Sequence, residues 1–428
     1  MKFFAALAAL LLIVAPANGQ TETDADTTVA ALMAEPVVQD AMARLEDMRE
    51  TNNERLVAIN EIPAPPFGEE PRAADIAERM RALGLDDVTI DEVGNVIGRR
   101  PGAPGGETIA IVAHLDTVFP EGTDVTVRRE GNVFTAPGIG DNSRGLVALL
   151  ALIDVLQAEE IETRDTLLFI GSVGEEGIGD LRGVRHLFRP GAEIVDAFIA
   201  IDGGDVERLV VNAVGSLRYR VTFAGPGGHS YAAFGMAHPH QALAEAIVRF
   251  TESATPITLD GDKATFSVGR IEGGTSVNSI PFESTMEVDM RSASPDKLNA
   301  LHDAFLASMH DALAAENARR REGPELELSL TPIGYRPPGQ NDPGQPLVQH
   351  AVAALRTFGI DAEMRESSTD ANIPMSLGVP AITISRGGIS RDAHSPDESW
   401  EDVDAHVALQ ATLLLILAEA ELIGPTVH

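Results

Sequence analysis

Four apolar runs in this chain lead into side chains that could bind a metal ion or transfer a proton. These side chains are His114 and Asp116 after the first run, Glu175 and Glu176 after the second, Asp202 after the third, and His394 beyond the fourth. Because the chain has no cysteine, any metal site must use histidine and carboxylate ligands, which zinc accepts. A carboxylate that binds no metal could move a proton. These side chains are therefore potential metal ligands.

The four runs have the composition of buried strands. They cover residues 108–116, 166–174, 197–204 and 380–388, and their hydrophobicity is continuous rather than alternating. Such runs are typical of an α/β fold with a mostly parallel sheet covered by helices, and residues 143–157 are predicted to form one of these helices. In open α/β sheets, ligands bind at the carboxyl ends of the strands, so we expect the side chains named above to converge in one crevice.

Three local patterns are compatible both with such a site and with ordinary structural roles. In "HLD", residues i and i+2 of a strand share a face, so Asp116 could accept the second imidazole N–H of His114; a simple turn or an ordinary buried hydrogen bond is the alternative. Asp141 lies in the glycine-bracketed stretch "APGIGDNSRG", where it could instead cap a helix. The adjacent Glu175 and Glu176 could belong to a solvated loop.

The 428 residues are enough for two domains. Residues 215–332 follow the order strand, helix, strand, strand, helix, strand, which is typical of a split βαβ unit. We therefore predict a ferredoxin-like α+β domain at 215–332, inserted between two parts of a catalytic domain at 20–214 and 333–428. The acidic residues 20–34 are expected to be mobile.

The N-terminus is predicted to be a signal peptide covering residues 1–19. One lysine precedes an apolar stretch from Phe3 to Val14, and small residues end at Gly19. A membrane anchor is the alternative, but the stretch is shorter than the ~20 residues that span a bilayer. The net charge of -33 disfavours nucleic acid and anionic lipid as partners. We expect an exported protein, periplasmic or secreted, with no membrane attachment after cleavage.

Five motifs, in order, resemble the co-catalytic zinc exopeptidases and deacylases. They are "AHLDTV", "GIGDNSRG", "GEEGIGD", "IDGG" and "AHSPDE". This family includes glutamate carboxypeptidase, acetylornithine deacetylase, aminoacylase and peptidase T. The resemblance implies two Zn²⁺ ions per chain, with Co²⁺ or Mn²⁺ as possible substitutes, and a cis peptide bond after the bridging aspartate. It assigns the metal ligands as His114 and Asp202 for one ion, Glu176 and His394 for the other, and Asp141 as the bridge.

The same resemblance assigns the catalytic roles. Glu175 would be the general base that takes a proton from a water between the ions, and Asp116 would orient His114. In the inserted domain, which resembles the family's lid and dimerisation domain, His229 of "GPGGHS" would stabilise the oxyanion in the partner's site. A homodimer is therefore expected.

Four further residues match positions that contact substrate in the family. Arg291 could hold a carboxylate bidentately, or could pair with Asp289 at the surface. Asn278 could contact substrate or organise a turn. Gly387 and Gly388 could let substrate approach the backbone, although a plain turn explains them almost as well.

The sequence departs from the common family patterns at two places. Arg144 stands where many members have lysine, and "SSTDAN" has serines where a glycine pair is frequent. Both departures leave the substrate class open. The predicted function is hydrolysis of a peptide or N-acyl amide bond in a small peptide or N-acyl amino acid, by a carboxypeptidase, dipeptidase, tripeptidase or deacylase. The alternative is an inactive relative that binds such molecules.

Overall fold

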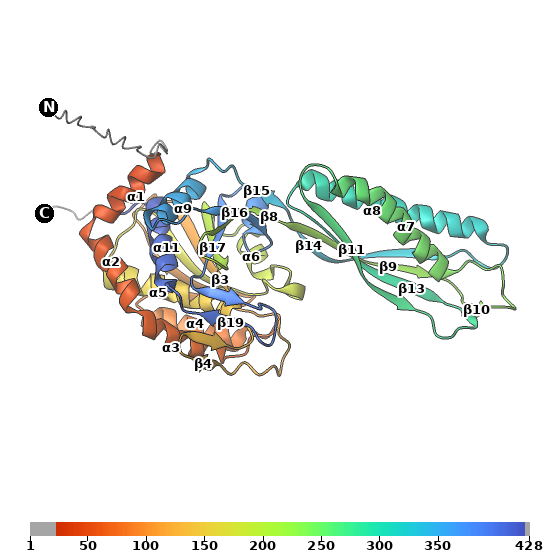
Figure 1. The fold of residues 1–428 in the computed structure, drawn as a ribbon, viewed down its shortest axis with the longest axis horizontal. Helices are drawn as coiled ribbons and strands as arrows, with labels where there is room; N and C mark the ends of the chain where they lie inside the picture. The colour runs from red at the N-terminus through yellow and green to blue at the C-terminus, as the bar shows by residue number, and fades with distance from the viewer. Residues whose placement is uncertain (1–22, 424–428) are drawn as a thin grey trace, which may run out of the picture.

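The computed structural model describes residues 23–423, and the predicted signal peptide lies outside these described residues. The described chain has a large lobe and an elongated small lobe that extends from one side of it (Figure 1). The large lobe is built on a nine-stranded sheet with the order β1-β2-β6-β3-β7-β17-β8-β15, in which β16 also pairs with β8. Its strands are β1 (Asp87–Ile90), β2 (Val96–Arg100), β3 (Thr108–His114), β6 (Thr166–Ser172), β7 (Ala197–Gly203), β8 (Arg208–Ala213), β15 (Gly339–Gln340), β16 (Glu363–Ser367) and β17 (Ala381–Ser385).

The centre of this sheet is parallel, as predicted. Strands β6, β3, β7 and β17 run in the same direction, whereas β1 and β2 on one side and β8 and β15 on the other add antiparallel pairs. The four apolar runs of the sequence form the four parallel strands. In the pairing of β3 with β6, His114 lies opposite Ser172, so the ends of these strands lie at the same edge.

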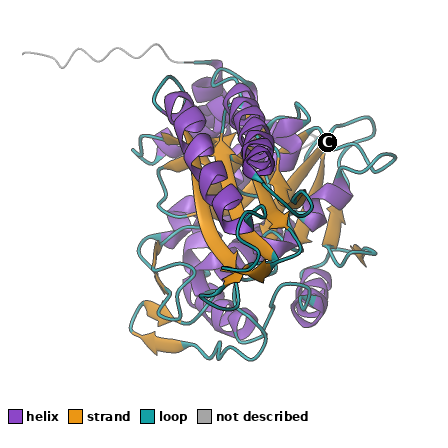
Figure 2. Ribbon diagram, turned by 90° about the vertical axis from the view of Figure 1, so that its right-hand side faces the viewer, coloured by secondary structure: helices purple, strands orange, loops and turns teal. Residues whose placement is uncertain are grey.

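Helices cover both faces of the large sheet (Figure 2). Alternate residues of β3 belong to different apolar clusters, with Ile109 and Ile111 facing one layer and Ala110 and Val112 the other. The helices of this lobe are α1 (Asp24–Ala34), α2 (Pro36–Asp47), α3 (Arg49–Asn60), α4 (Glu70–Ala82), α5 (Gly145–Ala158), α6 (Arg182–Leu187), α9 (Pro346–Thr357), α10 (Asn372–Ser376) and α11 (Ala405–Glu419). Burial on both faces explains why the strands are continuously apolar.

One local prediction in this lobe was wrong, and a second needs a shifted boundary. Residues 20–34 were expected to be mobile, but α1 packs on the core through the buried Ala25, Val29 and Leu32. The helix predicted at residues 143–157 is present as α5, but it begins at Gly145, because Asp141 and Asn142 in the preceding turn have non-helical backbone dihedral angles.

The small lobe has its own four-stranded antiparallel sheet, with two helices and a separate apolar core. Its elements are β9 (Gly215–Ala224), α7 (Pro239–Thr258), β11 (Ala264–Gly273), β13 (Glu283–Ser292), α8 (Pro295–Arg319) and β14 (Glu327–Arg336), with a short pair β10 (Gly228–His229) and β12 (Ser279–Ile280). The order of elements is the predicted one, but β14 continues to Arg336, beyond the predicted boundary at residue 332. Whether the two lobes are independent folding domains stays a prediction.

The remaining strands form a small antiparallel sheet in the large lobe. They are β4 (Arg128–Glu130), β5 (Val133–Thr135), β18 (Ile389–Arg391) and β19 (Ser399–Glu401). Among residues 23–423, no helix is both long enough and apolar enough to cross a membrane.

Candidate metal centre

The carboxyl ends of the parallel strands bring together the five side chains predicted to bind metal. His114 ends β3, Asp202 is the second-to-last residue of β7, and Glu176 follows β6. Asp141 lies in the turn before α5, and His394 follows β18. The parallel arrangement of the strands therefore explains why His114, Glu176 and Asp202 converge, and two loops bring Asp141 and His394 to the same edge.

Asp141 belongs to two groups of candidate ligands, in which the ligand atoms lie within 4.8 Å of one another. In the first group, His114 Nε2 is 3.1 Å from Asp141 Oδ1 and 3.6 Å from Asp202 Oδ1. In the second group, His394 Nε2 is 2.9 Å from Glu176 Oε1 and 3.3 Å from Asp141 Oδ2. Each oxygen of Asp141 thus serves a different group, which is the arrangement of a carboxylate shared between two ions.

The chemistry of these donors fits two divalent ions. Each group combines one imidazole with two carboxylates, and zinc accepts both ligand types. Hydrogen bonds to Asp141 and Glu176 raise the pKa of His394 to about 10. Burial by itself would lower the pKa of His114, but hydrogen bonds to Asp116, Asp141 and Asp202 raise it well above its usual range. Both imidazoles thus lie in strongly negative surroundings that favour a cation.

Glu398 fixes the turn that carries Asp141. Its buried carboxylate accepts backbone N–H groups of Gly138, Gly140 and Asp141 at 3.1, 2.9 and 2.8 Å. The peptide bond between Asp141 and Asn142 is cis, as predicted. Glu398 lies within the "AHSPDE" motif, but neither its residue type nor its position in the sequence indicated that it holds this turn.

The close packing of Gly145 holds the other side of this turn. A Cβ atom at Gly145 would lie 2.6 Å from the carbonyl oxygen of Ile201, next to Asp202. Asn142 Nδ2 donates to the same carbonyl at 2.9 Å. The first turn of α5 can therefore approach β7 closely only with glycine at this position.

Asp116 differs from its prediction in one respect. Strand β3 ends at His114, so the face-sharing rule does not extend to Asp116. The atom closest to His114 Nδ1 is the backbone carbonyl of Asp116, at 3.0 Å, whereas the Asp116 carboxylate lies 3.6 Å away. That carboxylate accepts the backbone N–H groups of Glu175 and Glu176 at 3.0 and 2.8 Å. Asp116 thus positions the glutamate pair as well as the imidazole.

Glu175 is buried beside the candidate ligands, so the solvated-loop alternative does not apply. Its side chain also belongs to a close group with His114 and Glu176. Arg336 Nη1 donates to Glu175 Oε1 at 2.9 Å, and Arg336 Nη2 also contacts the Glu175 carbonyl. Burial raises the pKa of Glu175 well above its usual range, while Arg336 opposes that rise. No sequence signal pointed to Arg336.

Arg386 is a second arginine that the sequence analysis missed. It is buried, and its Nη1 lies 3.2 Å from both Asp141 Oδ1 and Asp202 Oδ1. Arg386 therefore balances the negative charge of the first ligand group. It follows directly after β17, so the strand-end rule that selected the other residues could have found it.

A cavity of about 700 Å³ opens onto the candidate ligands, and Arg291 lies in its wall. Arg291 Nε also donates to Asp289 at 2.6 Å, so both of its expected roles are compatible with the structure. Gly387 and Gly388 are not among the described residues that line this cavity. Both have positive φ, and a Cβ there would lie 2.5 Å from Ala405 O or Trp400 Nε1, respectively, so packing and the turn account for these glycines.

His229 and Asn278 lie together in the small lobe, away from the candidate ligands. The backbone carbonyl of Asn278 accepts Ser230 N–H at 2.9 Å, and its side chain accepts the Ser276 hydroxyl at 2.5 Å. Strand β10, which contains His229, lies at the far end of the small lobe from the large sheet (Figure 1). Neither residue belongs to the cavity wall among the described residues. A substrate role for Asn278 stays a prediction.

The fold and the site define an α/β protein with a candidate two-metal centre at the carboxyl edge of its sheet. The chain belongs to Peptidase family M20/M25/M40, whose model matches residues 110–419. The resemblance inferred from the five motifs is thereby confirmed.

Relatives by sequence include a protein of unassigned activity. The uncharacterized protein YqjE of Bacillus subtilis is 28% identical over 324 residues, which cover 73% of this chain and 83% of that protein. Carboxypeptidase G2 of Pseudomonas is 26% identical over 324 residues, with 73% of each chain covered. Peptidase T of Aeromonas hydrophila is 24% identical over 353 residues, which cover 74% of this chain and 83% of that protein.

Solved structures share the fold. Aminopeptidase PepT of Bacillus cereus has a TM-score of 0.70 at 22% identity, covering 87% of this chain and 98% of the other. The Bacillus subtilis YXEP protein, described as a dinuclear metal binding peptidase of the M20 family, has a TM-score of 0.65 at 19% identity, covering 90% and 100%. The predicted fold class is confirmed by these matches.

Proposed function

We propose that this protein is a two-zinc metallohydrolase that cleaves a peptide or N-acyl amide bond in a small peptide or N-acyl amino acid. The observation that carries the proposal is the shared Asp141, which belongs to both histidine and carboxylate groups, with the buried Glu175 beside them. Membership of a peptidase family supports hydrolysis of peptides. The names of carboxypeptidase G2 and peptidase T among its relatives point in the same direction.

In this proposal His114, Asp141 and Asp202 hold one ion, and Asp141, Glu176 and His394 hold the other. When bound, the ions would polarise the scissile carbonyl and make water more acidic. Co²⁺ or Mn²⁺ could replace zinc in such a donor set.

Glu175 acts as the general base. Its carboxylate takes a proton from the attacking water and delivers that proton to the departing amine. Asp116 holds the backbone of this loop through two N–H groups, and Arg336 holds the carboxylate itself. Because the side chain is buried, bulk water does not compete with these contacts.

The small lobe supplies the remaining parts of the proposal. Arg291 in the cavity wall holds a substrate carboxylate. Residues 215–332 act as a lid and dimerisation domain, and His229 stabilises the oxyanion in the partner subunit's site. His229 Nδ1 accepts the backbone N–H groups of Tyr231 and Ala232, which leaves the hydrogen on Nε2, ready to donate.

Export is also part of the proposal. It rests on the apolar stretch of residues 3–14 between a lysine and small residues. N-terminal sequencing of the protein recovered from its host's extracellular or periplasmic fraction would test it, with a mature start near residue 20 as the expected result.

The variant Glu175→Gln tests the catalytic role. It keeps the size and the Arg336 contact on Oε1 but cannot take a proton, so turnover should fall about 100-fold to 10,000-fold. Metal content, measured by mass spectrometry of the purified protein, should stay at two ions per chain. Substrates are a panel of dipeptides, tripeptides and N-acyl amino acids supplied with Zn²⁺, Co²⁺ or Mn²⁺.

The exposed Glu322 provides a control, because Glu322→Gln removes the same charge at a residue that is neither a candidate ligand nor part of the cavity wall. Near-normal turnover by Glu175→Gln would rule out the proposed base. If the wild-type protein with its full metal content cleaves no member of the panel, the inactive peptide-binding relative becomes the better description.

A further inference from the structure

A second cavity adjoins the cavity that contains the candidate metal ligands. Both are lined by Val118, Glu176 and Gly177, so they meet beside a candidate ligand. Gly177 has a φ of +47°, and a Cβ atom there would meet no atom beyond its chain neighbours within 4 Å. Space is therefore open where the two cavities meet. The volume of the second cavity is about 850 Å³, which is ample for a substrate side chain.

The wall of this second cavity is mainly apolar, and we call it the apolar cavity. Phe67, Val118 and Ile178 line it together with five prolines, whereas Glu121 and Glu176 are the only charged side chains among its described lining residues. Phe67 and Ile178 leave 63% and 75% of their surface exposed. Exposed apolar side chains that gather beside a polar site are typical of a ligand-binding groove.

Arg182 holds the loop that carries Phe67. Its guanidinium carbon lies 4.7 Å from the centre of the Phe67 ring, and its Nη2 donates to the buried Glu69 at 2.7 Å. The same side chain packs on Gly174, where a Cβ atom would collide with the guanidinium. The loop is thus tied to the segment that leads into the candidate base. Because the wall is formed in advance, little conformational freedom is lost when a ligand binds.

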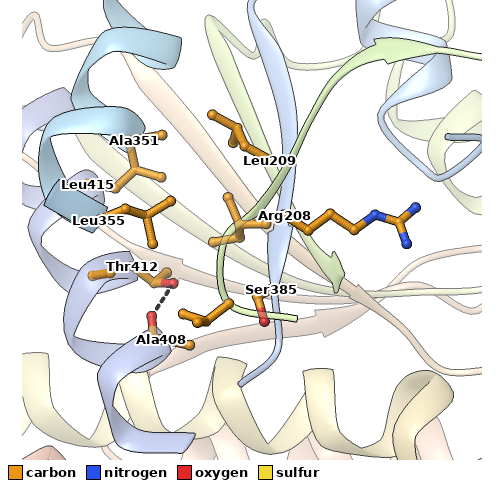
Figure 3. Close-up of a pocket in the computed structure, with 11 residues that line it drawn as sticks. Arg208, Leu209, Ala351, Leu355, Ser385, Ala408, Thr412 and Leu415 are labelled. Carbon is orange, nitrogen blue, oxygen red and sulfur yellow. Dashed lines mark hydrogen bonds between the residues drawn. The ribbon is translucent and has the colours of Figure 1, made fainter. Parts of the chain in front are cut away.

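A further apolar pocket beside the candidate centre is too small for a substrate group. Leu209, Leu355 and Leu415 line it, and Arg208 lines both this pocket and the cavity of the candidate ligands (Figure 3). Its volume is about 20 Å³, which is enough for a water molecule. The apolar cavity at Phe67 and Ile178 is therefore the better place for an apolar part of a ligand.

The direction of the substrate follows from the charges on the two sides of the candidate centre. In the proposed function, Arg291 holds a carboxylate on the leaving-amine side of the scissile bond. Arg291 lines the cavity of the candidate ligands, but no described residue of the small lobe lines the apolar cavity. With the scissile carbonyl at the candidate ligands, the acyl side of the substrate points past Glu176 toward Phe67 and Ile178.

We propose that the apolar cavity binds a large apolar group on the acyl side of the scissile bond. This inference rests on the proposed function, because it specifies the substrate class of the same site. The substrate is thus a dipeptide with a large apolar N-terminal residue, or an N-acyl amino acid with a large apolar acyl group. A glycine or an acetyl group in this place leaves the apolar wall in contact with water.

The test compares substrates that differ only in the size of the group on the acyl side. The pairs are Phe-Ala with Gly-Ala and N-phenylacetyl-alanine with N-acetyl-alanine. We expect kcat/KM of the metal-loaded wild-type enzyme to favour the aromatic member of at least one pair by about tenfold to a hundredfold, as for burial of a large apolar group. Equal kcat/KM values within both pairs, or a preference for the smaller members, would overturn the proposal.

The variant Ile178→Ser removes apolar surface from the wall at a side chain that is 75% exposed, so the fold does not depend on it. We expect the preference for the aromatic member to fall about fivefold, and Phe67→Ser to act in the same direction. Ile194→Ser is the matched control, since Ile194 is also 75% exposed and lines neither cavity. A preference that is unchanged in both Ile178→Ser and Phe67→Ser would overturn the proposal.

Sedimentation of Ile178→Ser distinguishes a substrate site from a contact between two copies of the chain. We expect the variant to keep the oligomeric state of the wild-type protein. Loss of a dimer in Ile178→Ser, but not in Ile194→Ser, would show that a second copy covers the apolar cavity, and the proposal would be wrong.

A binding measurement separates this inference from the proposed function. If no substrate is cleaved, hydrolysis is in doubt, but calorimetry with phenylacetohydroxamate and acetohydroxamate still measures the apolar cavity, because both compounds bind metal through the same group. We expect the phenyl compound to bind the metal-loaded protein about tenfold more tightly, and Ile178→Ser to reduce the difference. Equal affinities in the wild-type protein would refute the apolar site.

Discussion

Asp141 shows how one side chain can set the properties of a whole site. Its two oxygens face different histidines, and Arg386 approaches the oxygen that also faces His114. Burial by itself would raise the pKa of Asp141, but Arg386 and then the two histidines lower it well below its usual range. The carboxylate therefore stays ionised. When no metal is bound, the positive charges around it are the two protonated imidazoles and the guanidinium of Arg386.

Metal affinity should consequently rise with pH. The pKa of His394 is raised to about 10, and that of His114 also lies well above its usual range, so both must lose a proton when they bind metal. We expect apparent Zn²⁺ affinity to increase from pH 6 to pH 8, with release of about two protons per fully loaded chain. Calorimetry in buffers of different ionisation enthalpy measures this release.

The free energy of unfolding of the metal-free protein should instead fall as pH rises. The contribution of the His394 ion pairs is complete below its ordinary pKa of 6.5 and is lost as pH rises through about 10. His310→Gln serves as a control, because His310 is exposed on α8 and should alter neither trend. A Zn²⁺ affinity that is constant across this pH range would contradict the protonation states inferred here.

At the scale of elements, β14 connects the small lobe to the candidate base. It pairs with β9 along the small sheet, with Arg336 opposite Ser216 at the end nearest the large lobe. Arg336 is thus the last residue of a strand that leaves one lobe, while its side chain pairs with Glu175 in the other. The position of the small lobe and the surroundings of the base are therefore physically connected.

The variant Arg336→Met should test this connection. It leaves the Glu175 carboxylate buried without its cation, so we expect the free energy of unfolding to fall by about 3 to 5 kcal/mol. Since Arg336 lowers the pKa of Glu175, its loss should also move the acidic limb of the kcat/KM profile to higher pH.

Urea denaturation and a pH–rate profile measure these two effects. Arg336→Lys should retain part of both, because it keeps the charge but loses the planar pair of donors. An unchanged pH profile in Arg336→Met would show that the arginine has only a structural role.

At the scale of the whole molecule, the oxyanion role proposed for His229 depends on a second chain. Strand β10 lies at the far end of the small lobe in Figure 1, so His229 cannot serve the candidate centre of its own chain without a large rearrangement. The apolar side chains of Tyr231, Phe234 and Val277 are exposed in the neighbouring segments, with 89%, 72% and 102% of their surface accessible. Such a surface is typical of one that packs against a partner.

A mixture of two inactive variants should therefore recover activity. In a heterodimer of Glu175→Gln with His229→Ala, one of the two sites has an intact Glu175 and receives an intact His229 from the other chain. Random pairing of equal amounts should restore roughly a quarter of wild-type activity in the mixture, and the purified heterodimer should have about half. Co-expression with two different affinity tags, followed by tandem purification and assay, tests this expectation.

The separate variants set the baseline for this experiment. His229→Ala alone should lower kcat far more than it changes KM, because an oxyanion contact acts mainly in the transition state. No recovery in the purified heterodimer, or full activity in a protein that is monomeric by sedimentation, would contradict a shared site.

Much of the large lobe and of the candidate centre could be predicted from the sequence. The apolar runs were recognisable because strands buried on both faces must be apolar at every position, and their ends located His114, Glu176 and Asp202. Arg336 could not be found in this way, since it comes from a strand of the other lobe. Gly387 and Gly388 looked like substrate positions in the sequence, but only packing revealed the neighbours that exclude a side chain there.

The sequence by itself determined which residues are available for chemistry and which strand ends carry them. It did so because local hydrophobicity and the absence of cysteine depend on composition and order alone. Only the tertiary structure decided that Asp141 faces both histidines, that Asp116 holds the glutamate loop, and that arginines far apart in the sequence line one cavity. These features depend on distances between residues that are far apart in the chain, and such distances are set by how the strands and lobes pack.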